Sequence, residues 1–246
     1  MEEKVALVTG GIRGIGEKIS QRFLKEGYQV VALDNDEKRL ADWAETQKAA
    51  GLNKIDTVVC DVCDYEQCQS AVAAILSKFG HIDVMVNNAG ITRDATFKKM
   101  DKSQWDAVIQ VNLNSMFNMT KPVIDNMLAN QRGRIINMSS INGQKGQFGQ
   151  ANYSAAKAGV HGFTKALAQE VARKNITVNT ISPGYINTEM MQAIPDDVLE
   201  TIKAQIPVGR LGEADEIAEL VIYLSGDNAG FITGSNIAIN GGQHMC

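Results

Sequence analysis

The chain has 246 residues, of which 44% are hydrophobic and 21% are charged, so it has enough apolar material for a large core. Its formal net charge of −4 argues against a nucleic-acid-binding protein, which usually carries a basic surface. No apolar run approaches the ~18 residues that a membrane helix needs. The acidic start of the chain also lacks the basic region of a signal peptide. We therefore expect a cytoplasmic protein with no nucleic-acid and no membrane partner.

Short apolar runs alternate with helical patterns along the whole chain. The runs typical of buried strands are residues 4–8, 29–33, 56–60, 82–86, 133–138, 176–181 and 236–239. Helical spacing of apolar residues is found at residues 17–27, 36–51, 64–79, 103–129, 152–174 and 213–224. Pro122, inside the longest helical pattern, predicts a kink. Periodicity is weak after residue 184, so residues 184–212 are expected to form a substrate loop or lid.

Strands that alternate with helices form right-handed βαβ units with parallel strands. The predicted fold class is therefore α/β: a single domain over residues 1–246, with a doubly wound, parallel seven-stranded sheet and helices on both faces. Ligands of such sheets bind beyond the carboxyl ends of the strands. The unusual residues of the chain follow those strand ends: residues 10–16, Asp34, Asp61, residues 87–90, Ser140 and residues 183–184.

A glycine-rich turn with Gly10, Gly14 and Gly16 lies between the first strand and the first helix. Glycines there permit a tight turn and let backbone N–H groups approach a pyrophosphate at the helix N-terminus. A tight connection without a ligand is the alternative. Asp34 ends the second strand, where a carboxylate binds ribose hydroxyls and repels a 2′-phosphate.

Arg13 indicates the opposite cofactor preference, because a guanidinium can pair with a 2′-phosphate. Its alternative reading is an exposed turn charge without a ligand. Because Asp34 stands where the ribose should lie, we predict a nicotinamide cofactor, with NAD(H) favoured over NADP(H). Asp61 and Val62 follow the third strand and can bind the adenine, unless Asp61 only caps the next helix.

Tyr153 and Lys157 are four residues apart in a predicted helix, so they project from one face one turn apart. An ammonium group beside a phenol favours the phenolate and lowers the tyrosine pKa, which suits general acid–base chemistry. Ser140 precedes Tyr153 by thirteen residues, and a glycine-rich return loop connects the two. A Tyr-x-x-x-Lys pair is common on helices, so this pair alone does not establish a site.

Four cysteines are present: Cys60, Cys63, Cys68 and Cys246. Cys60 and Cys63 have the spacing of a metal or redox pair, but a second such pair is missing and no histidine is near. Cys60 also ends an apolar strand, where a cysteine is often a small buried apolar residue. We expect reduced structural thiols and no metal.

Together these motifs resemble the short-chain dehydrogenase/reductase family, whose members have a Rossmann fold. The matching motifs are Thr9-Gly-Gly-Ile-Arg-Gly-Ile-Gly16, Asn87-Asn-Ala-Gly90, Asn112, Ser140, Tyr153-Ser-Ala-Ala-Lys157 and Pro183-Gly184. They span the chain in the family's order and spacing. The resemblance implies an NAD(P)H-dependent enzyme with a catalytic tetrad of Asn112, Ser140, Tyr153 and Lys157.

In this implied tetrad, Ser140 polarises a keto group and Tyr153 donates the proton. Lys157 lowers the Tyr153 pKa and binds the nicotinamide ribose, while Asn112 holds a water in a proton relay. A kink or cap in the long helix is the alternative for Asn112. The implied cofactor contacts are Gly10, Ile12, Arg13, Gly14, Ile15, Gly16, Asp34, Asp61, Val62, Asn88, Ala89, Gly90, Tyr153, Lys157, Pro183, Gly184, Ile186 and Thr188.

Within the family, residues 141–150 and 88–94 are similar to those of acetoacetyl-CoA reductases. That similarity implies reduction of acetoacetyl-CoA, an acyl-CoA thioester, to (R)-3-hydroxybutyryl-CoA for polyhydroxybutyrate synthesis. The implied substrate pocket contains Asp94, Ser140, Gln147, Phe148, Gln150, Tyr153, Gly184 and Tyr185. Loop turns are the alternative for Gln147 and Gln150. Asp34 departs from the NADPH-linked members, which lack an acid at that position.

A 3-oxoacyl-ACP reductase of fatty-acid synthesis is the alternative enzyme, because the motifs overlap. Acidic ACP needs a basic patch beside the pocket. Gln131 stands where those enzymes usually carry a basic residue, although Arg132 and Lys174 remain, so a CoA thioester is favoured. A non-catalytic nucleotide-binding regulator would be expected to lose the Tyr or the Lys. The resemblance also implies a homotetramer, with interfaces on residues 103–129, residues 152–174 and the last strand.

Overall fold

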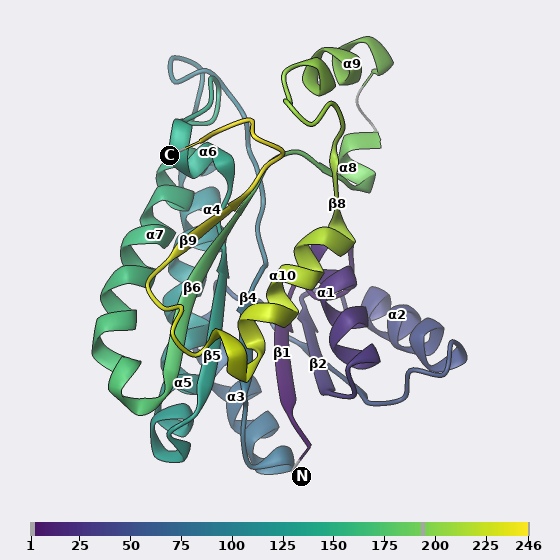
Figure 1. Cartoon of the computed structure of the whole chain (residues 1–246), viewed down its shortest axis with the longest axis vertical. Coiled ribbons are helices and arrows are strands. Elements are labelled where there is room, and N and C mark those ends of the chain that lie inside the picture. Colours follow the sequence, from purple (N-terminus) through teal and green to yellow (C-terminus); the bar gives the residue numbers. More distant parts are fainter. Residues whose placement is uncertain (1–2, 193–194, 246) are drawn as a thin grey trace.

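The computed structural model describes residues 3–192 and 195–245 (Figure 1). Within them, seven parallel strands form the central sheet in the order β3-β2-β1-β4-β5-β6-β9, which confirms the predicted parallel sheet. The strands are β1 (Val5–Thr9), β2 (Gln29–Asp34), β3 (Ile55–Val59), β4 (Val84–Asn87), β5 (Gly133–Met138), β6 (Ile176–Pro183) and β9 (Asn236–Ile239). The chain builds outward from β1 to β3 and then returns to the other side of β1 with β4. Ligands of doubly wound sheets bind at this reversal.

Helices cover both faces of the sheet, as predicted (Figure 1). One face packs against α1 (Gly14–Lys25), α2 (Glu37–Ala49) and α10 (Ala214–Ser225). The other packs against α3 (Tyr65–Phe79), α5 (Ser115–Asn130) and α7 (Ala151–Val171). Successive side chains of a strand point to opposite faces. In β1, Ala6 and Val8 therefore join the first core, while Val5 and Leu7 join the second.

The helical pattern at residues 103–129 is interrupted before Pro122. It consists of α4 (Lys102–Ile109), a π-helical turn (Gln110–Asn114) and α5, and Pro122 lies inside α5. The Asn112 side chain donates to the carbonyl of Val108, four residues earlier, at 2.9 Å. A side chain inserted into the hydrogen-bond ladder distorts a helix. The departure from regular α geometry therefore lies at residues 110–114, and the proline did not predict it.

Two stretches expected to be irregular contain short elements. The return loop after Ser140 includes α6 (Ile141–Lys145). The predicted lid contains α8 (Glu189–Gln192) and α9 (Asp196–Ala204), and its two ends are joined by the parallel pair β7 (Ile186–Asn187) and β8 (Gly212–Glu213). Figure 1 shows α9 standing clear of the sheet. Its short length and the prolines on either side explain why the sequence pattern there is weak.

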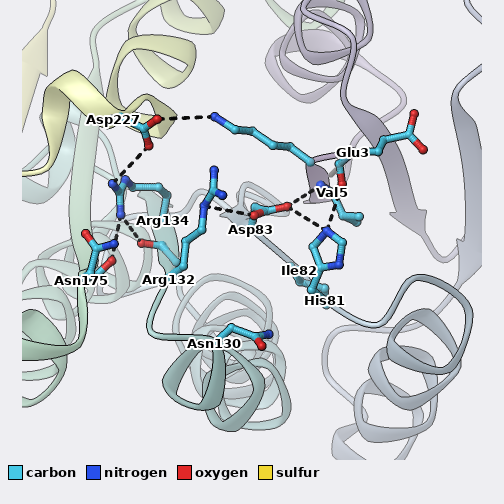
Figure 2. Close-up of polar contacts among 12 residues, drawn as sticks. Glu3, Val5, His81, Ile82, Asp83, Asn130, Arg132, Arg134, Asn175 and Asp227 are labelled. Atoms are coloured by element: carbon cyan, nitrogen blue, oxygen red, sulfur yellow. Dashed lines mark hydrogen bonds and ion pairs between the residues drawn. The ribbon is translucent and has the colours of Figure 1, made fainter. Parts of the chain in front are cut away.

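The amino-terminal ends of the strands are joined by a polar network (Figure 2). The buried carboxylate of Asp83 accepts from the Val5 backbone N–H at 2.7 Å. It also lies 3.3 Å from His81 Nε2 and 3.3 Å from Arg132 Nε. Arg134 donates to the carbonyl of Asn175 at 3.0 Å. These contacts tie β1, β4, β5 and the start of β6 together at the sheet edge opposite the glycine-rich turn.

Short 3-10 turns at Ala172–Lys174 and Asp227–Ala229 complete the described elements. In the part of the chain that the structure describes, no helix combines the length and apolar character needed to cross a membrane.

Candidate active site

A cleft of about 670 Å³ lies at the carboxyl ends of the strands on the β1–β4 side. Twelve residues that the sequence singled out for a cofactor line it: Gly10, Arg13, Gly14, Ile15, Gly16, Asp34, Asp61, Val62, Asn88, Ala89, Gly90 and Thr188. Its other lining residues were not foreseen: Leu33, Asn35, Arg39, Cys60, Ile91, Thr92, Arg93, Val111 and Glu189. The cleft thus collects residues from Gly10 to Glu189, which come from widely separated parts of the chain.

The glycine-rich turn has the backbone geometry that requires glycine. Gly10 and Gly14 have φ angles of +59° and +53°, in the left-handed region. A Cβ at Gly16 would lie 2.0 Å from the carbonyl oxygen of Gly10. Arg13 precedes α1, and no side chain in the described ranges caps this helix end. The first N–H groups of α1 therefore remain available to an anion at the cleft.

The end of β4 is tied directly to this turn. Asn88 donates from Nδ2 to the carbonyls of Thr9 and Gly10, at 3.0 and 3.2 Å. The Thr9 hydroxyl oxygen accepts from the N–H groups of Asn88 and Ala89, at 3.0 and 3.1 Å. The walls of the cleft are therefore held in place by the protein's own hydrogen bonds.

Asp34 is buried at the end of β2, where its Oδ1 accepts from the Asp36 N–H at 3.2 Å. Arg39, which the sequence analysis missed, reaches the same cleft from the first turn of α2 and pairs with Asp36 at 3.2 Å. Three arginines, Arg13, Arg39 and Arg93, thus line the cleft that also contains Asp34. The place of Arg39 in the sequence could have predicted this position, because it is three residues after Asp36, which caps α2 close to Asp34 at the end of β2.

Asp61 lines the cleft and does not cap α3. Its Oδ1 accepts from the Cys63 N–H at 2.9 Å. The cap of α3 is Asp64, which accepts from the Gln67 N–H at 3.0 Å. The capping alternative for Asp61 is therefore wrong, and its position at the cleft is compatible with the adenine contact.

Ser140, Tyr153 and Lys157 are brought together by the packing of α6 on α7. A Cβ at Gly143, in α6, would lie 2.7 Å from the carbonyl carbon of Lys157, so the two backbones are in close contact. Ser139 adds a hydrogen bond from its hydroxyl to the Lys157 carbonyl, at 2.8 Å. Ser140 is thereby close enough to Tyr153 for its hydroxyl to lower the pKa of the phenol. This arrangement confirms that the return loop brings the serine to the Tyr-Lys helix face.

The pKa of Tyr153 is raised, because its hydroxyl is buried. The Ser140 hydroxyl lowers this pKa in part, and the nearby Asp94 charge raises it further. Burial also lowers the pKa of Lys157 to about 8, and its ammonium group donates to the Met138 carbonyl at 2.7 Å. It lies 5.6 Å from the Tyr153 ring centroid. Burial outweighs the contact with Ser140, so the pKa of Tyr153 lies above its ordinary value, and the lowering of this pKa by Lys157 stays a prediction.

Asn112 is fully buried beside Lys157, and its amide is committed to the backbone. Its Nδ2 donates to the carbonyls of Ile91 and Val108, both at 2.9 Å. Its Oδ1 accepts from the Ile91 N–H at 3.2 Å. Gly90 separates it from the lysine: a Cβ there would lie 2.7 Å from Asn112 Oδ1 and 3.6 Å from Lys157 Nζ. The helix-distorting role is thus observed, and both amide hydrogens are used.

The residues expected to form the acyl pocket are divided between two places. Gln150 donates to Asp94 Oδ2 at 2.8 Å, next to the exposed Phe148. Gln147 accepts from Lys145 at 3.0 Å. Tyr185, in contrast, lines a separate cavity of about 110 Å³ between β7 and α10.

Six of the expected cofactor residues do not line the main cleft: Ile12, Tyr153, Lys157, Pro183, Gly184 and Ile186. Ile12 is buried in the core under α1, and Ile186 lines the smaller cavity with Tyr185. Pro183 is buried at the end of β6, and the adjacent Gly184 donates from its N–H to the Ile239 carbonyl at 3.0 Å.

The cysteines that meet are not the pair with C-x-x-C spacing. Cys60 and Cys68 are both buried, with their sulfur atoms 3.9 Å apart. Burial, followed by the charge of Asp61, raises the pKa of Cys63 to about 11. Across residues 3–192 and 195–245, no group of three or more His, Cys, Asp or Glu residues could hold a metal. Cys246 lies outside the described residues.

Comparisons with known proteins agree with this arrangement. The sequence profile of the family described as short chain dehydrogenase matches residues 4–199. An acetoacetyl-CoA reductase from Cupriavidus necator is 53% identical over 246 residues, which cover 100% of both chains. An acetoacetyl-CoA reductase from Shinella zoogloeoides is 57% identical over 245 residues, 98% of each chain. A 3-oxoacyl-(acyl-carrier-protein) reductase from Thermotoga maritima is 43% identical over 243 residues, 98% of each chain.

Proposed function

Because the chain belongs to the short chain dehydrogenase family, we propose that this oxidoreductase reduces acetoacetyl-CoA to (R)-3-hydroxybutyryl-CoA with a nicotinamide cofactor. The observation that carries the reaction type is the grouping of Ser140, Tyr153 and the buried Lys157, whose ammonium group lies 5.6 Å from the Tyr153 ring centroid. The choice of substrate is supported by the activity named for the relatives that are more than half identical to this chain.

The main cleft fits a dinucleotide. The open N-terminus of α1 and the glycines of the turn suit a pyrophosphate, since no Cβ obstructs the approach. Asp34 would hold the adenosine ribose, Asp61 and Val62 the adenine, and Thr188 the nicotinamide carboxamide. A nicotinamide cofactor held by these residues would supply the hydride for reduction of the substrate carbonyl.

The protein's own groups handle the carbonyl oxygen. The Ser140 hydroxyl oxygen accepts from the Asn142 N–H at 3.1 Å, so its hydrogen is directed away from that contact and can polarise a keto oxygen. The raised pKa of Tyr153 keeps its proton in place at neutral pH, as a general acid requires. Lys157 supplies positive charge as that proton leaves. Asn112 retains only acceptor capacity for a water, through Oδ1 or its backbone carbonyl.

The enzyme is proposed to prefer NAD(H). Asp34 is buried at the end of β2, where the adenosine ribose would lie, and a carboxylate there would repel a 2′-phosphate. Arg39 could favour NADP(H), but it already pairs with Asp36. Arg13 is exposed and remains the strongest argument for NADP(H). Initial rates with NADH and NADPH at equal concentrations test this choice, and a higher kcat/KM with NADPH would contradict it.

A CoA carrier is proposed rather than ACP. The two basic residues offered for ACP, Arg132 and Lys174, precede β5 and β6 and so lie at the edge opposite Ser140. Arg132 is also paired with the buried Asp83 (Figure 2). Within one chain, neither residue lies beside the proposed pocket. Steady-state rates with acetoacetyl-CoA and acetoacetyl-ACP decide between the carriers, and faster turnover of the ACP thioester would overturn this proposal.

A homotetramer in the cytoplasm with a closing lid over residues 184–212 completes the proposal. Exposed apolar residues support self-association: Phe117 on α5 is 54% exposed and stacks on Tyr65, and Phe231 is fully exposed near the edge strand β9. The hinge of the lid would be the β7–β8 pair. Light scattering of the purified chain tests the tetramer, and a monomer at micromolar concentration would exclude it.

A further inference from the structure

A chain of amide hydrogen bonds runs from the exposed loop after β4 to the catalytic serine. Gln150 donates from Nε2 to Asp94 Oδ2 at 2.8 Å. Gln150 Oε1 in turn accepts from Asn142 Nδ2 at 2.9 Å. The backbone N–H of Asn142 then donates to Ser140 Oγ at 3.1 Å. Four residues from two separate segments are thus connected in one line.

The carboxylate of Asp94 fixes the direction of every bond in this chain. An ionised carboxylate only accepts hydrogen bonds, so Gln150 must turn its NH₂ group toward it. Gln150 then presents its oxygen to Asn142, which must answer with its own NH₂ group. Reversing either amide would place two acceptors against each other, which is unfavourable in a partly buried site.

This orientation leaves a buried acceptor unused. Asn142 is 8% exposed, and its Oδ1 has no hydrogen-bond partner anywhere in the described ranges. Unsatisfied buried polar atoms destabilise a protein, and native structures contain few of them. The side chain is therefore held against its own local preference, and the contact that holds it is the bond to Gln150.

We propose that Asn142 is a positioning residue, and that the polarity of the chain Asp94–Gln150–Asn142 sets the placement of the Ser140 hydroxyl for proton transfer with Tyr153. This proposal rests on the proposed ketone reduction and adds to it a residue outside the tetrad. Asp94, at the outer end of this series of hydrogen bonds, belongs to the expected substrate pocket. A substrate that contacts Asp94 or Gln150 is thereby coupled to the serine that polarises its carbonyl.

The surrounding structure makes this a rigid connection. Gly143, the next residue after Asn142, is in backbone contact with Lys157 on α7. The Ala95 N–H donates to the Gly149 carbonyl at 2.9 Å, so the two loops move together. The buried Asn152 donates to the Arg93 carbonyl at 3.0 Å. A displaced Asn142 therefore has little freedom to find another partner.

Reversal of the polarity tests the proposal. In Asn142→Asp, the new carboxylate cannot donate to Gln150, and if Gln150 turns around, its oxygen faces Asp94. We expect kcat with acetoacetyl-CoA to fall about 10- to 100-fold with a small change in KM, the size typical of one lost buried hydrogen bond or more. In Asp94→Asn/Asn142→Asp, the amide at position 94 donates to Gln150, and Gln150 donates to the carboxylate at position 142.

The double variant is therefore expected to turn over faster than Asn142→Asp alone. Contacting residues show such non-additive effects, whereas independent sites do not. Acidification provides a second readout, because a protonated carboxyl at position 142 can donate to Gln150 again. Relative to wild type at the same pH, Asn142→Asp should recover as pH falls, while the double variant should not. A side chain that only fills space would give neither result.

Asn114→Asp is the matched control. Asn114 is exposed and donates to Gln110 at 2.8 Å, which reproduces the Asn–Gln contact without a carboxylate at the far end. We expect no more than about a twofold change in kcat. The proposal would be overturned if kcat falls equally in Asn142→Asp and in the double variant, or if the effects of the two substitutions on kcat simply add.

Thermal unfolding gives the same comparison without any substrate. The melting temperature should fall in Asn142→Asp and recover in the double variant. A double variant that is less stable than both Asn142→Asp and Asp94→Asn would also overturn the proposal. A wild-type protein inactive on acetoacetyl-CoA would instead overturn the proposed function. The melting temperatures would still test whether Asp94, Gln150 and Asn142 are coupled.

Discussion

The two edges of one parallel sheet carry polar residues that are used in opposite ways. At the amino-terminal edge, the buried carboxylate of Asp83 has three partners: the Val5 N–H, His81 and Arg132. At the carboxyl edge, polar groups are left open: the N-terminus of α1 is uncapped, and Asn142 retains an unpartnered oxygen among the described residues.

The contrast teaches where stability and function are located in this fold. Buried charges are tolerated when each has partners, so the amino-terminal edge contributes to holding the strands together. Unfilled hydrogen-bonding capacity costs stability unless a ligand completes it. The Asp83 carboxylate at one edge is therefore satisfied by the protein itself, whereas the uncapped N-terminus of α1 at the other edge is open to a ligand. Variants at the two edges should separate activity from stability.

The largest effect on turnover is expected from Tyr153→Phe at the carboxyl edge. Removal of the proton donor should lower kcat by about 10²- to 10⁴-fold, the usual contribution of general acid catalysis. Cofactor binding should persist, because the phenol ring is retained. Quenching of protein fluorescence by NADH measures the binding, and initial rates measure the turnover. Retained turnover would remove Tyr153 from the proposed chemistry.

Gly16→Ala tests whether the cofactor approaches the turn through missing side chains. The added Cβ would lie 2.0 Å from the Gly10 carbonyl, so the turn must shift. We expect the Kd for NADH to rise about tenfold or more, and each tenfold rise corresponds to a loss of ~1.4 kcal/mol in binding free energy. Gly162→Ala on α7 is the control, because a Cβ there meets no described atom within 4 Å. Unchanged NADH affinity in Gly16→Ala would contradict this picture of the turn.

The pH dependence of reduction tests the proposed charge on Lys157. Burial lowers its pKa to about 8, so the ammonium group loses its proton as pH rises through that value. Because the charged form supports departure of the Tyr153 proton, kcat should decline by about tenfold above that pH. Lys157→Arg keeps its charge and should move the decline to higher pH. A kcat that is flat through this range would argue against the role.

Asp34→Ala is expected to change cofactor choice more than speed. Loss of the carboxylate removes repulsion of a 2′-phosphate and a ribose contact. The ratio of kcat/KM for NADH to that for NADPH should fall about tenfold, roughly the value of one charge-assisted hydrogen bond. Arg13→Ala should raise the same ratio. If Asp34→Ala leaves the ratio unchanged, the carboxylate does not select the cofactor.

The smallest effect on turnover is expected from Asp83→Asn at the amino-terminal edge. Loss of its charge leaves Arg132 without its partner and should destabilise the fold by about 3 kcal/mol, as for other buried pairs that lose one member. The kcat of the folded enzyme should stay within about twofold of wild type, since the edge is remote from Ser140. Asp56→Asn breaks the exposed pair with Lys78 and should cost less than about 1 kcal/mol. Urea unfolding provides both values.

Local patterns predicted most of the sheet and half of the site. Continuous apolar runs and the residues directly after them located Asp34, Asp61 and Asn88, because parallel strands end at a common edge. Contacts between distant segments were not predictable. Arg39 reaches the cleft from the following helix, and the π-helical turn depends on Asn112 meeting Ile91 across the fold.

The electrostatics of the site were also beyond the sequence pattern. The spacing of Tyr153 and Lys157 predicted their shared face but not the depth of burial, which determines the direction of both pKa shifts. Burial depends on α6 packing against α7 through Gly143, a contact that no local pattern shows. The Cys60–Cys68 contact was missed for the same reason, since it depends on how β3 meets α3.

The central claim is that the open carboxyl edge of the sheet is a ketone-reducing site for a CoA thioester. Its most direct test mixes the purified chain with NADH and acetoacetyl-CoA and measures both NADH loss and product by chiral chromatography. We expect one (R)-3-hydroxybutyryl-CoA to be formed for each NADH oxidised. Binding of NADH without product, or formation of the (S) product, would contradict it.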